Sequence, residues 1–513
     1  MIWIVPALLS APMAPDTLPA PLRMEIQCSY QALESAFYWA QTKALSFVQT
    51  GKQGPVNVWK QGQGAEMKTY IPSYWAGYPL RTAFYSRDFC HQVAGAHLLG
   101  LEEENFSMLR AFAQSANAST KWYPLWALNF DGSPYTLDYR NNDDFVREVP
   151  AVFELVEKMD QLYRWTGDPR YFSDSSLWLF ATKALTDFID LHDRQFPNGV
   201  AEGTGTGSIF AGVATYNEQR DAPLIEAGDG LASQYQAFLA YSDLAARRKE
   251  QSLANRFAQK AETLKAYFHS DWGIRNTDWY NRGYIAGPRP ISGWGKENSW
   301  FLLTKGLAAP DSPRTHRYLE FIGERLDSRE DIPDNIEALT YIPETFFRYH
   351  RNELAWKWMK HIILRIDQTH SQSALTGANG NYPEVSFVLI SNVVEYLLGI
   401  TPDAGKRRLR TLSHMPDDLK LLEVRHIPIG KALFSVAHSG PASSKLTYQK
   451  GGTPFIWEAA FPGKYAHVTV NGKKKRCRYT QDFGQVISYI PVRIKPGKTI
   501  EVKVPSSFDK AAL

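Results

Sequence analysis

Cysteine is scarce in this chain, which contains only Cys28, Cys90 and Cys477 among 513 residues. Three scattered thiols argue against a disulfide framework, and their spacing matches no zinc site. Cys90 precedes His91, but the sequence offers no further partner for a cysteine nucleophile. We therefore expect structural thiols, and a protein that needs no metal and no cofactor.

Signatures of several enzyme classes are also missing. No HExxH segment occurs, and His91 and His97 in "HQVAGAH" are too far apart to bind one metal from one helix face. The glycines of "AEGTGTGSIFAG" follow no predicted strand and lead to no Lys-Ser/Thr pair, so they do not form a phosphate loop. A serine nucleophile elbow is absent as well. These absences disfavour zinc peptidases, P-loop enzymes and serine hydrolases.

Neither sign of charge is in large excess. The chain has 57 Lys and Arg against 53 Asp and Glu, a net charge of +4, and its basic residues look dispersed. A nucleic-acid-binding protein usually has a concentrated basic face. We therefore expect no nucleic-acid partner.

Long hydrophobic runs are lacking too. The apolar start "MIWIVPALLSAPMA" is too short to span a membrane, and no Lys or Arg precedes its apolar residues, so it is a poor secretory signal. We interpret residues 1–25 as an N-terminal extension with a weak signal-like character, and we expect no membrane span. The compartment stays open, with a periplasmic or secreted location favoured over the cytoplasm.

Aromatic residues, in contrast, are abundant: 15 Trp, 26 Tyr and 27 Phe. Most belong in a core, but rings in polar loops can form flat platforms that stack on sugar rings. Long loops with Trp, Tyr, Gly and Pro occur at about 118–143, 194–225, 271–293, 328–339 and 368–382. Loops of this length in a compact domain are usually functional.

Pairs of helical runs separate these loops. In "LYRWTGDPRYFSDSSLWLF" and "FFRYHRNELAWKWMKHII", apolar residues recur at helical spacing on both sides of a short turn. Short turns join antiparallel neighbours. The helices that follow a long loop are placed at about 80–100, 144–166, 227–246, 294–307, 341–350 and 384–399, and their partners at about 26–50, 103–117, 168–193, 249–270, 312–327 and 353–367.

This alternation predicts an all-α (α/α)6 barrel over residues 26–405, in which the helices after the long loops form the inner ring. Beyond it, short alternating segments such as "YAHVTVNGK" and "KTIEVKV" predict strands, and Val470–Lys473 reads as a hairpin turn. We expect a linker at 406–414 and a small antiparallel β-sandwich at 415–513. This second domain contains no catalytic cluster, and a structural role for it is favoured over sugar binding.

The first turns of the inner helices should meet at one end of such a barrel. A single acidic first turn is ordinary capping, as Pro343-Glu344 and Pro383-Glu384 illustrate. Six acidic starts in one cavity would instead repel each other and separate their pKa values, as acid–base catalysis requires. The residues at these starts are Arg87, Asp88 and His91; Asp143, Asp144, Arg147 and Glu148; Glu226 and Asp229; Glu297; Glu344; and Glu384, with Arg220 and Arg282 at the same end.

Three segments resemble the six-hairpin glycosidases. "YPLRTAFYSRDFCHQVAGAHLLGL" is similar to the first hairpin of glucoamylase- and trehalase-like members, in which an Arg-Asp pair holds the sugar. "IEALTYIPETFFRYH" and "NYPEVSFVLISNVVEYLLGITPDAG" look closer to bacterial β-glucuronidase-type members. The resemblance implies a general acid at the third inner helix, Glu226, and a general base at the sixth, Glu384. Asp229 is a rival acid, and Glu344 is a rival base.

The function implied is hydrolysis of a glycosidic bond, with exo action on a uronic-acid sugar of the β-glucuronide type in an oligo- or polysaccharide. A polysaccharide lyase with a Tyr or His base, and a non-catalytic glycan-binding barrel, remain as alternatives. Arg87, Asp88 and His91 would hold sugar hydroxyls, Arg147 or Arg220 the uronate, and Trp126, Tyr216, Trp294 and Tyr382 would stack on sugar rings.

Overall fold

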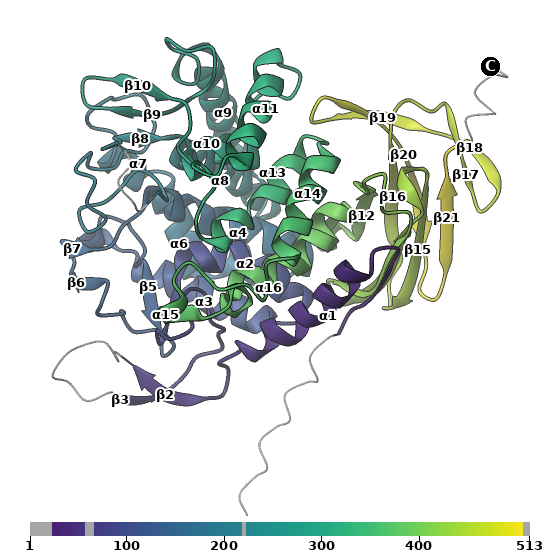
Figure 1. The fold of residues 1–513 in the computed structure, drawn as a ribbon, viewed down its shortest axis with the longest axis horizontal. Coiled ribbons are helices and arrows are strands. Elements are labelled where there is room, and N and C mark those ends of the chain that lie inside the picture. Colours follow the sequence, from purple (N-terminus) through teal and green to yellow (C-terminus); the bar gives the residue numbers. More distant parts are fainter. Residues whose placement is uncertain (1–22, 57–65, 218–221, 506–513) are drawn as a thin grey trace, which may run out of the picture.

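The computed structural model describes residues 23–56, 66–217 and 222–505. In this part of the chain, helices form a closed inner ring in which each contacts the next, and the last contacts the first. Figure 1 shows this helical body beside a separate stack of strands. The inner helices are α2 (Ser86–Leu98), α4 (Val149–Thr166), α8 (Gly228–Arg247), α10 (Glu297–Thr304), α13 (Ile342–Arg348) and α16 (Pro383–Ser391), which continues as the π-helix η4 (Asn392–Leu397).

A second set of helices packs outside this ring. Most contact the inner helix beside them in sequence, and Tyr318 of the α11 helix donates a hydrogen bond to the Ser299 carbonyl of α10. The predicted alternation of inner and outer helices is therefore confirmed. The outer helices are α1 (Gln31–Ser46), α3 (Glu102–Ser115), α5 (Arg170–Ser173), α6 (Ser175–Ala184), α7 (Asp187–Leu191), α9 (Gln251–Tyr267), α11 (Pro313–Asp327) and α14 (Asn352–Ile363), with the short α12 (Ile336–Leu339) and α15 (Ser373–Thr376) in loops.

The inner helices are largely buried, and α16 is the most apolar of them. Every residue of α16 is buried, as expected for a helix surrounded by other helices. Gly95 lets α2 and α16 approach closely, because a Cβ atom there would lie 2.1 Å from the carbonyl oxygen of Phe387. The inner ring is thus held by direct contact between helix backbones.

The description of the helical part as all-α is wrong, because short strands line its loops. These strands also explain why two helices begin later than predicted. Ala83–Tyr85 pairs with Ala127–Asn129, so α2 begins at Ser86, and Asp144–Phe145 pairs with Tyr139–Asn141, so α4 begins at Val149. The loop strands are β2 (Gln53–Val56), β3 (Glu66–Thr69), β4 (Ala83–Tyr85), β5 (Ala127–Asn129), β6 (Tyr139–Asn141), β7 (Asp144–Phe145), β8 (Glu226–Ala227), β9 (Asn281–Ile285) and β10 (Arg289–Ser292).

The C-terminal strands form two larger sheets. One has the order β1-β13-β14-β15-β21-β17-β18 and the other the order β11-β12-β16-β20-β19. Their packing as a β-sandwich stays a prediction. Their bounds are β1 (Glu25–Cys28), β11 (Ile400–Asp403), β12 (Arg408–Leu412), β13 (Leu422–Ile429), β14 (Ala432–His438), β15 (Ser443–Lys450), β16 (Phe455–Pro462), β17 (His467–Val470), β18 (Lys473–Arg476), β19 (Arg478–Asp482), β20 (Gln485–Ile494) and β21 (Thr499–Lys503).

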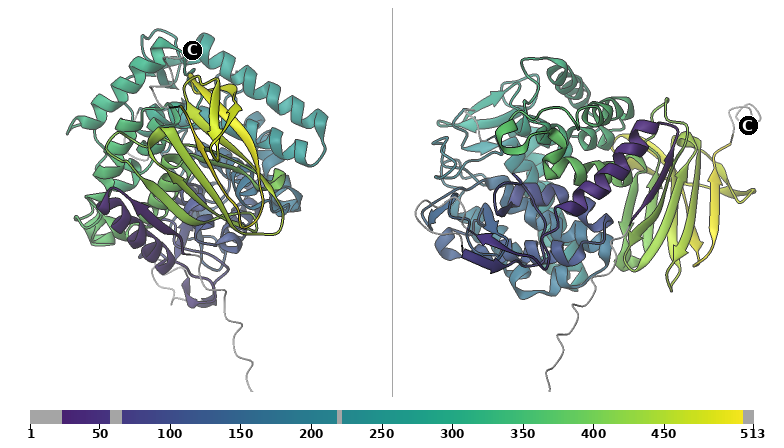
Figure 2. Two further views of the ribbon diagram at one scale, coloured as in Figure 1. Left: turned by 90° about the vertical axis from the view of Figure 1, so that its right-hand side faces the viewer. Right: turned by 60° about the horizontal axis from the view of Figure 1, so that its bottom comes forward.

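Two features cross the predicted domain limits. Strand β1, from the N-terminal end of the chain, pairs with β13, and Figure 2 shows it lying against the C-terminal strands. The predicted linker at 406–414 contains β12, which pairs with β16. The division into domains at 26–405 and 415–513 stays a prediction. The signal-like segment lies almost entirely outside the described residues.

Candidate active site

A cavity of about 680 Å³ lies at the N-terminal ends of the inner helices, under the long loops. Seven of the residues predicted from the sequence meet there: Arg87, Asp88, Trp126, Tyr216, Trp294, Glu297 and Tyr382. The shared direction of the inner helices brings them together, although they are up to about 300 positions apart in the chain. The other charged and aromatic residues of its lining are Tyr78, Arg81, Tyr85, Asp138, Lys296, Asp334 and Glu337.

Arg87 and Asp88 join the first hairpin to distant loops. The Tyr382 hydroxyl donates a hydrogen bond of 2.7 Å to Asp88 Oδ1. Arg87 donates to the Tyr216 carbonyl at 2.9 Å, and its guanidinium group lies 5.3 Å from the centre of the Tyr216 ring. Arg87 Nη1 also lies 3.9 Å from the buried carboxylate of Glu148. These contacts hold two of the predicted stacking rings in the cavity wall.

Glu337 is a cavity carboxylate that we did not select from the sequence. It is 6% exposed, and its Oε2 lies 2.9 Å from His370 Nε2. His370 Nδ1 accepts a hydrogen bond from the backbone N–H of Gln372, so the ring proton is on Nε2 and points to Glu337. The His370 ring also stacks on Tyr382. The signal was present in "DNIEAL", a carboxylate at the end of a long loop, seven positions before the selected Glu344.

Glu297 is the other glutamate of the lining, at the first position of α10. Its backbone N–H donates to the Asn217 side chain at 3.2 Å. The preceding residue, Lys296, also lines the cavity and has a backbone φ of 54°, which is strained for a residue other than glycine. A strained backbone conformation of this kind persists only where the surrounding structure enforces it.

Glu226 and Asp229, the sequence-based acid and its rival, do not line the cavity. Glu226 is 1% exposed and accepts hydrogen bonds from Trp272 Nε1 at 2.6 Å and Asn198 Nδ2 at 2.8 Å. Asp229 accepts from the Thr215 hydroxyl at 2.8 Å and the Tyr216 backbone N–H at 2.7 Å. Burial is the largest effect on both carboxyl groups, and it raises the pKa of each to about 7.

Glu384, the sequence-based general base, lies behind the cavity wall. It is 3% exposed, and its Oε1 lies 3.0 Å from His91 Nδ1. Burial, followed by the negative charge of Asp88, raises the pKa of Glu384 well above its ordinary value. Burial also lowers the pKa of His91, whose ring stacks on Tyr341 at 3.4 Å. His91 therefore contacts Glu384 and does not line the cavity with Arg87 and Asp88.

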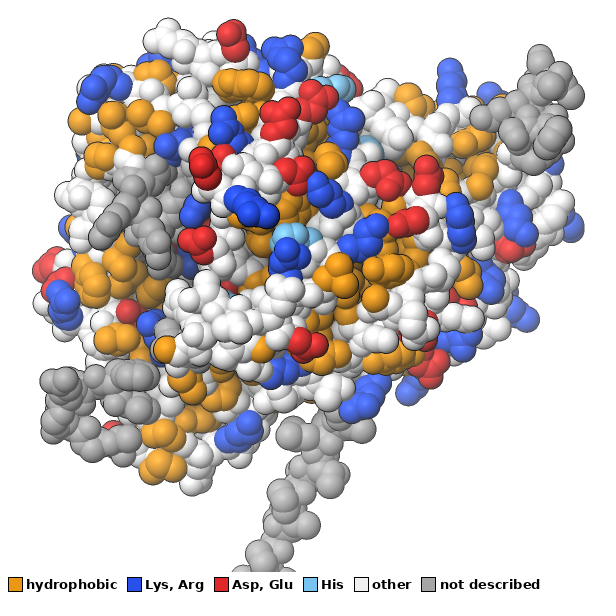
Figure 3. All heavy atoms as spheres, viewed as in Figure 1, with side chains coloured by type: hydrophobic (Ala, Val, Ile, Leu, Met, Phe, Trp, Pro, Cys, Tyr) orange, Lys and Arg blue, Asp and Glu red, His pale blue; other side chains and the backbone are white. Residues whose placement is uncertain are grey.

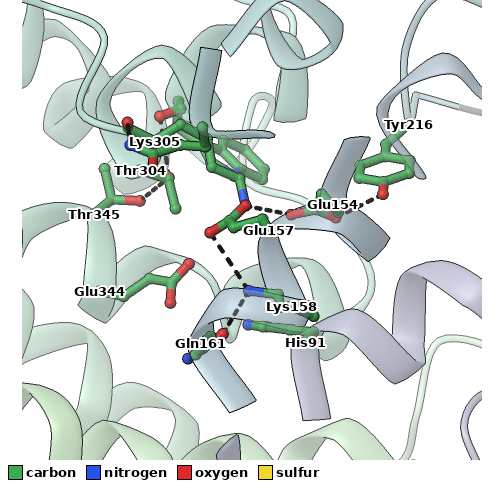
Figure 4. Close-up of polar contacts among 12 residues, drawn as sticks. His91, Glu154, Glu157, Lys158, Gln161, Tyr216, Thr304, Lys305, Glu344 and Thr345 are labelled. Carbon is green, nitrogen blue, oxygen red and sulfur yellow. Dashed lines mark hydrogen bonds and ion pairs between the residues drawn. The ribbon is translucent and has the colours of Figure 1, made fainter. Parts of the chain in front are cut away.

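Glu344, the rival base, lies on a second cavity of about 750 Å³ at the C-terminal ends of the inner helices. Its Oε2 accepts a hydrogen bond of 2.9 Å from the Tyr396 hydroxyl. In Figure 4 its carboxylate points toward Glu157 and Lys158, and Tyr216 lies beyond Glu154. Glu344 is therefore separated from the cavity that contains Arg87, Asp88 and Tyr216.

Buried ion pairs fill the barrel centre between the two cavities. The Tyr216 hydroxyl donates to Glu154 Oε2 at 2.6 Å, and Lys305 bonds the other oxygen of Glu154. Lys305 also donates to Glu157 Oε2 at 2.6 Å, and Lys158 is 3.6 Å from the other oxygen of Glu157 (Figure 4). This network holds the Tyr216 ring in place through its hydroxyl group.

The arginines proposed for the uronate have other roles or fall outside the described residues. Arg147 donates to the carbonyls of Asp143 at 2.8 Å and Phe210 at 2.6 Å, and therefore holds two loops together. Arg220 lies outside the described residues. Asp144 pairs at the surface with Arg140, at 2.9 Å.

In the described part of the chain, no group of three or more His, Cys, Asp or Glu side chains is placed to hold a metal ion. No helix within it is long and apolar enough to cross a membrane.

Solved structures with this fold are numerous, whereas no protein-family model and no curated protein matches the sequence. The chain is similar to an α-L-rhamnosidase from Dictyoglumus thermophilum, with a TM-score of 0.59, 13% identity and coverage of 94% of this chain and 51% of that one. A GH78 family rhamnosidase of Bacillus sp. GL1 matches with a TM-score of 0.56, 12% identity and coverage of 83% and 41%. A sialidase matches with a TM-score of 0.54, 11% identity and coverage of 91% and 41%.

These likenesses show that the chain shares the α/α-toroid fold of these solved structures. At such low identity they identify neither the substrate nor the catalytic residues. The chain spans about half or less of the length of these three structures.

Proposed function

We propose that the chain is a glycoside hydrolase that removes a terminal uronic-acid sugar, of the β-glucuronide type, from an oligo- or polysaccharide. The observation that carries this proposal is the 680 Å³ cavity, where carboxylates, cations and aromatic rings meet at the N-terminal ends of the inner helices. Its volume suits a small ligand. Aromatic rings offer stacking surfaces for a sugar, and paired carboxyl groups are the usual catalysts of glycoside hydrolysis. The fold shared with two rhamnosidases and a sialidase supports the same class.

We assign the acid–base pair to Glu297 and Glu337, because these glutamates line the cavity. The N–H of His370 donates a hydrogen bond to Glu337 and orients its carboxylate, which suits a base that activates water. Glu297 would then protonate the leaving oxygen. Arg87 and Asp88 would hold sugar hydroxyls, and Trp126, Tyr216, Trp294 and Tyr382 would supply stacking surfaces. Glu226 and Glu384 remain the competing, sequence-based assignment.

The uronate requires a cation in the cavity. Arg81 donates to the Tyr85 hydroxyl at 2.9 Å. Lys296 lines the cavity on a strained backbone, which supports a specific role for its ammonium group. We therefore assign Lys296 to the uronate carboxylate, in place of Arg147 and Arg220.

The test is turnover of a panel of aryl glycosides that includes a β-glucuronide. Glu297→Gln and Glu337→Gln should each lower kcat by about 10²- to 10⁴-fold, the usual contribution of an acid or base. Glu344→Gln, in the second cavity, is the matched control and should retain activity. The anomer of the first product, followed by NMR, then distinguishes inversion from retention.

Each other outcome identifies a different function. The sequence-based acid–base pair would be correct if Glu226→Gln and Glu384→Gln lose activity. In that case Glu297→Gln and Glu337→Gln should keep full activity. An unsaturated product that absorbs in the near ultraviolet would indicate a lyase. Glycan binding without any product would indicate a non-catalytic barrel. The variant Lys296→Met tests recognition of the uronate. It should raise KM for the glucuronide and leave KM for the matching glucoside unchanged. An equal rise in KM for both substrates would contradict the assignment of Lys296 to the uronate carboxylate.

A further inference from the structure

Positive charge is concentrated in the last strands of the chain. Residues 464–503 contain ten Lys and Arg against two acidic residues, Asp482 and Glu501, which is a net charge of +8. Because the whole chain has a net charge of +4, the remaining residues carry −4. The near-neutral total therefore conceals two regions of opposite charge, and the basic residues are not dispersed.

These cations are exposed. All four residues of β18, Lys473–Arg476, are exposed, and so are the other six cations of this region. Among the described residues, Lys503 forms the one ion pair found for the ten, with Glu501 at 2.9 Å. Figure 3 shows basic side chains along the end of the molecule formed by these strands. We call the ten cations the basic end: Lys464, Lys473, Lys474, Lys475, Arg476, Arg478, Arg493, Lys495, Lys498 and Lys503.

The strand register places some of these cations in one row. Thr469 of β17 lies opposite Lys474 of β18 and opposite Lys503 of β21. Directly opposed residues of antiparallel strands project from the same face. Lys474 and Lys503 therefore flank a threonine hydroxyl on one solvent-facing row, and Arg476, two positions from Lys474, shares that face.

Protection of a sheet edge explains part of this pattern. Strand β18 is the last strand of the seven-stranded sheet, and lysines on an edge strand prevent pairing with another chain. Arg478 on β19 and Arg493 on β20 belong to the other sheet. Lys495 and Lys498 lie in the turn between β20 and β21. Edge protection does not account for these residues, whereas binding of a polyanion accounts for all ten.

We propose that the basic end binds an acidic polysaccharide and anchors the protein to its polymeric substrate. This rests on the proposed function. A row of cations and hydroxyl groups on a sheet suits carboxylate-bearing chains by charge complementarity. Single-stranded nucleic acid binding usually uses several aromatic platforms. Tyr479 is the one large exposed aromatic ring found on these strands in the described residues. A polysaccharide is therefore favoured over a nucleic acid.

The test measures binding of the full chain to polygalacturonate by isothermal titration calorimetry at 50 and 200 mM NaCl. The variant Lys474→Glu/Lys475→Glu/Arg476→Glu should lower the affinity by about tenfold or more and weaken its salt dependence, because contacts between a cation and a polyanion release counterions. The control Arg256→Glu/Lys260→Glu/Arg317→Glu makes the same change in net charge at exposed positions on α9 and α11. It should bind like the unmodified protein.

Additional ligands and an activity measurement distinguish the alternatives. Neutral dextran should not bind. Equal weakening of polygalacturonate binding in both triple variants would mean that only the net charge matters. Tighter binding of a single-stranded DNA 20-mer or of anionic vesicles than of polygalacturonate would indicate another partner. Either result overturns the proposal. Turnover of a small aryl glycoside should be unchanged in the basic-end variant. Failure of the proposed function would remove that turnover in every form of the protein and leave polymer binding intact.

Discussion

At the residue scale, access to the cavity separates glutamates that look alike in the sequence. Glu226 and Glu337 both follow long loops and both are buried. Glu226 accepts hydrogen bonds from Trp272 and Asn198, away from the cavity, whereas Glu337 borders the cavity and accepts one from His370. Only a group that reaches the substrate can transfer a proton to it. We therefore propose a structural role for Glu226, which has a consequence for stability.

That consequence is a dependence of stability on pH. Burial raises the pKa of Glu226 to about 7, from an ordinary value near 4.5. Between these pH values the folded protein keeps a proton that the unfolded chain releases, so the free energy of unfolding falls as pH rises. Between pH 4.5 and 7, the free energy of unfolding of the wild-type protein should fall by roughly 3 kcal/mol more than that of Glu226→Gln. Urea unfolding at several pH values measures this difference.

The controls for this experiment are an exposed position and the absolute stability. Glu262→Gln changes an exposed glutamate of α9 and should follow the wild-type curve. The amide in Glu226→Gln cannot accept from both donors, so this variant should also be less stable at low pH by about 1–2 kcal/mol. Identical pH profiles for wild type and Glu226→Gln would refute the buried, proton-binding state.

At the element scale, a glycine allows two neighbouring inner helices to approach each other closely. Gly95 on α2 faces the backbone of Phe387 on α16, and backbone atoms cannot move aside as a side-chain end can. Gly323 on α11 is different, because a Cβ there has no atom within 4 Å. These two helical glycines form a matched pair for a test.

We expect Gly95→Ala to destabilise the protein by about 1–3 kcal/mol or more, the usual cost of overpacking. Gly323→Ala should stabilise it by about 0.5–1 kcal/mol, because alanine is the better helix former. Thermal unfolding followed by circular dichroism measures both changes. Equal effects of the two substitutions would mean that α2 and α16 do not meet through their backbones.

At the scale of the whole molecule, the described strands contact the helical ring at several places, which include β1 and the β19–β20 turn. Strand β1 pairs with β13, and the β19–β20 turn reaches the C-terminal ends of the inner helices. There His350 Nε2 contacts the Asp482 carbonyl at 2.8 Å, and the Phe483 ring meets Tyr349 edge-on at 5.3 Å. This turn also lines the second cavity, so the sheets close that end of the ring.

We expect Phe483→Ala to lower the free energy of unfolding by about 2–4 kcal/mol through loss of this contact. Tyr479→Ala on the adjacent strand removes an exposed ring and should change it by no more than about 0.5 kcal/mol. Urea unfolding measures both. A Phe483→Ala protein as stable as Tyr479→Ala would mean that the turn contributes nothing to holding the two parts together.

The helices and their order were predictable from the sequence, because burial of one face leaves a periodic pattern within each segment. Helix starts were less predictable. The starts of α2 and α4 depend on strands that pair with distant loops, and Ala83 does not indicate its pairing with Asn129. The membership of β1 in a C-terminal sheet has the same cause, since strand pairing is not local.

By itself, the sequence determined the alternation of helices, and therefore the end of the ring at which Arg87, Asp88, Trp126 and Tyr382 meet. The tertiary structure alone decided which carboxylates reach the cavity. Glu337 reaches it, while Glu226, Glu344 and Glu384 are directed to other partners. The physical reason is that a periodic pattern specifies the face of a helix, whereas the direction of a single side chain depends on hydrogen-bond partners such as Trp272, Tyr396 and His91, which come from other parts of the chain.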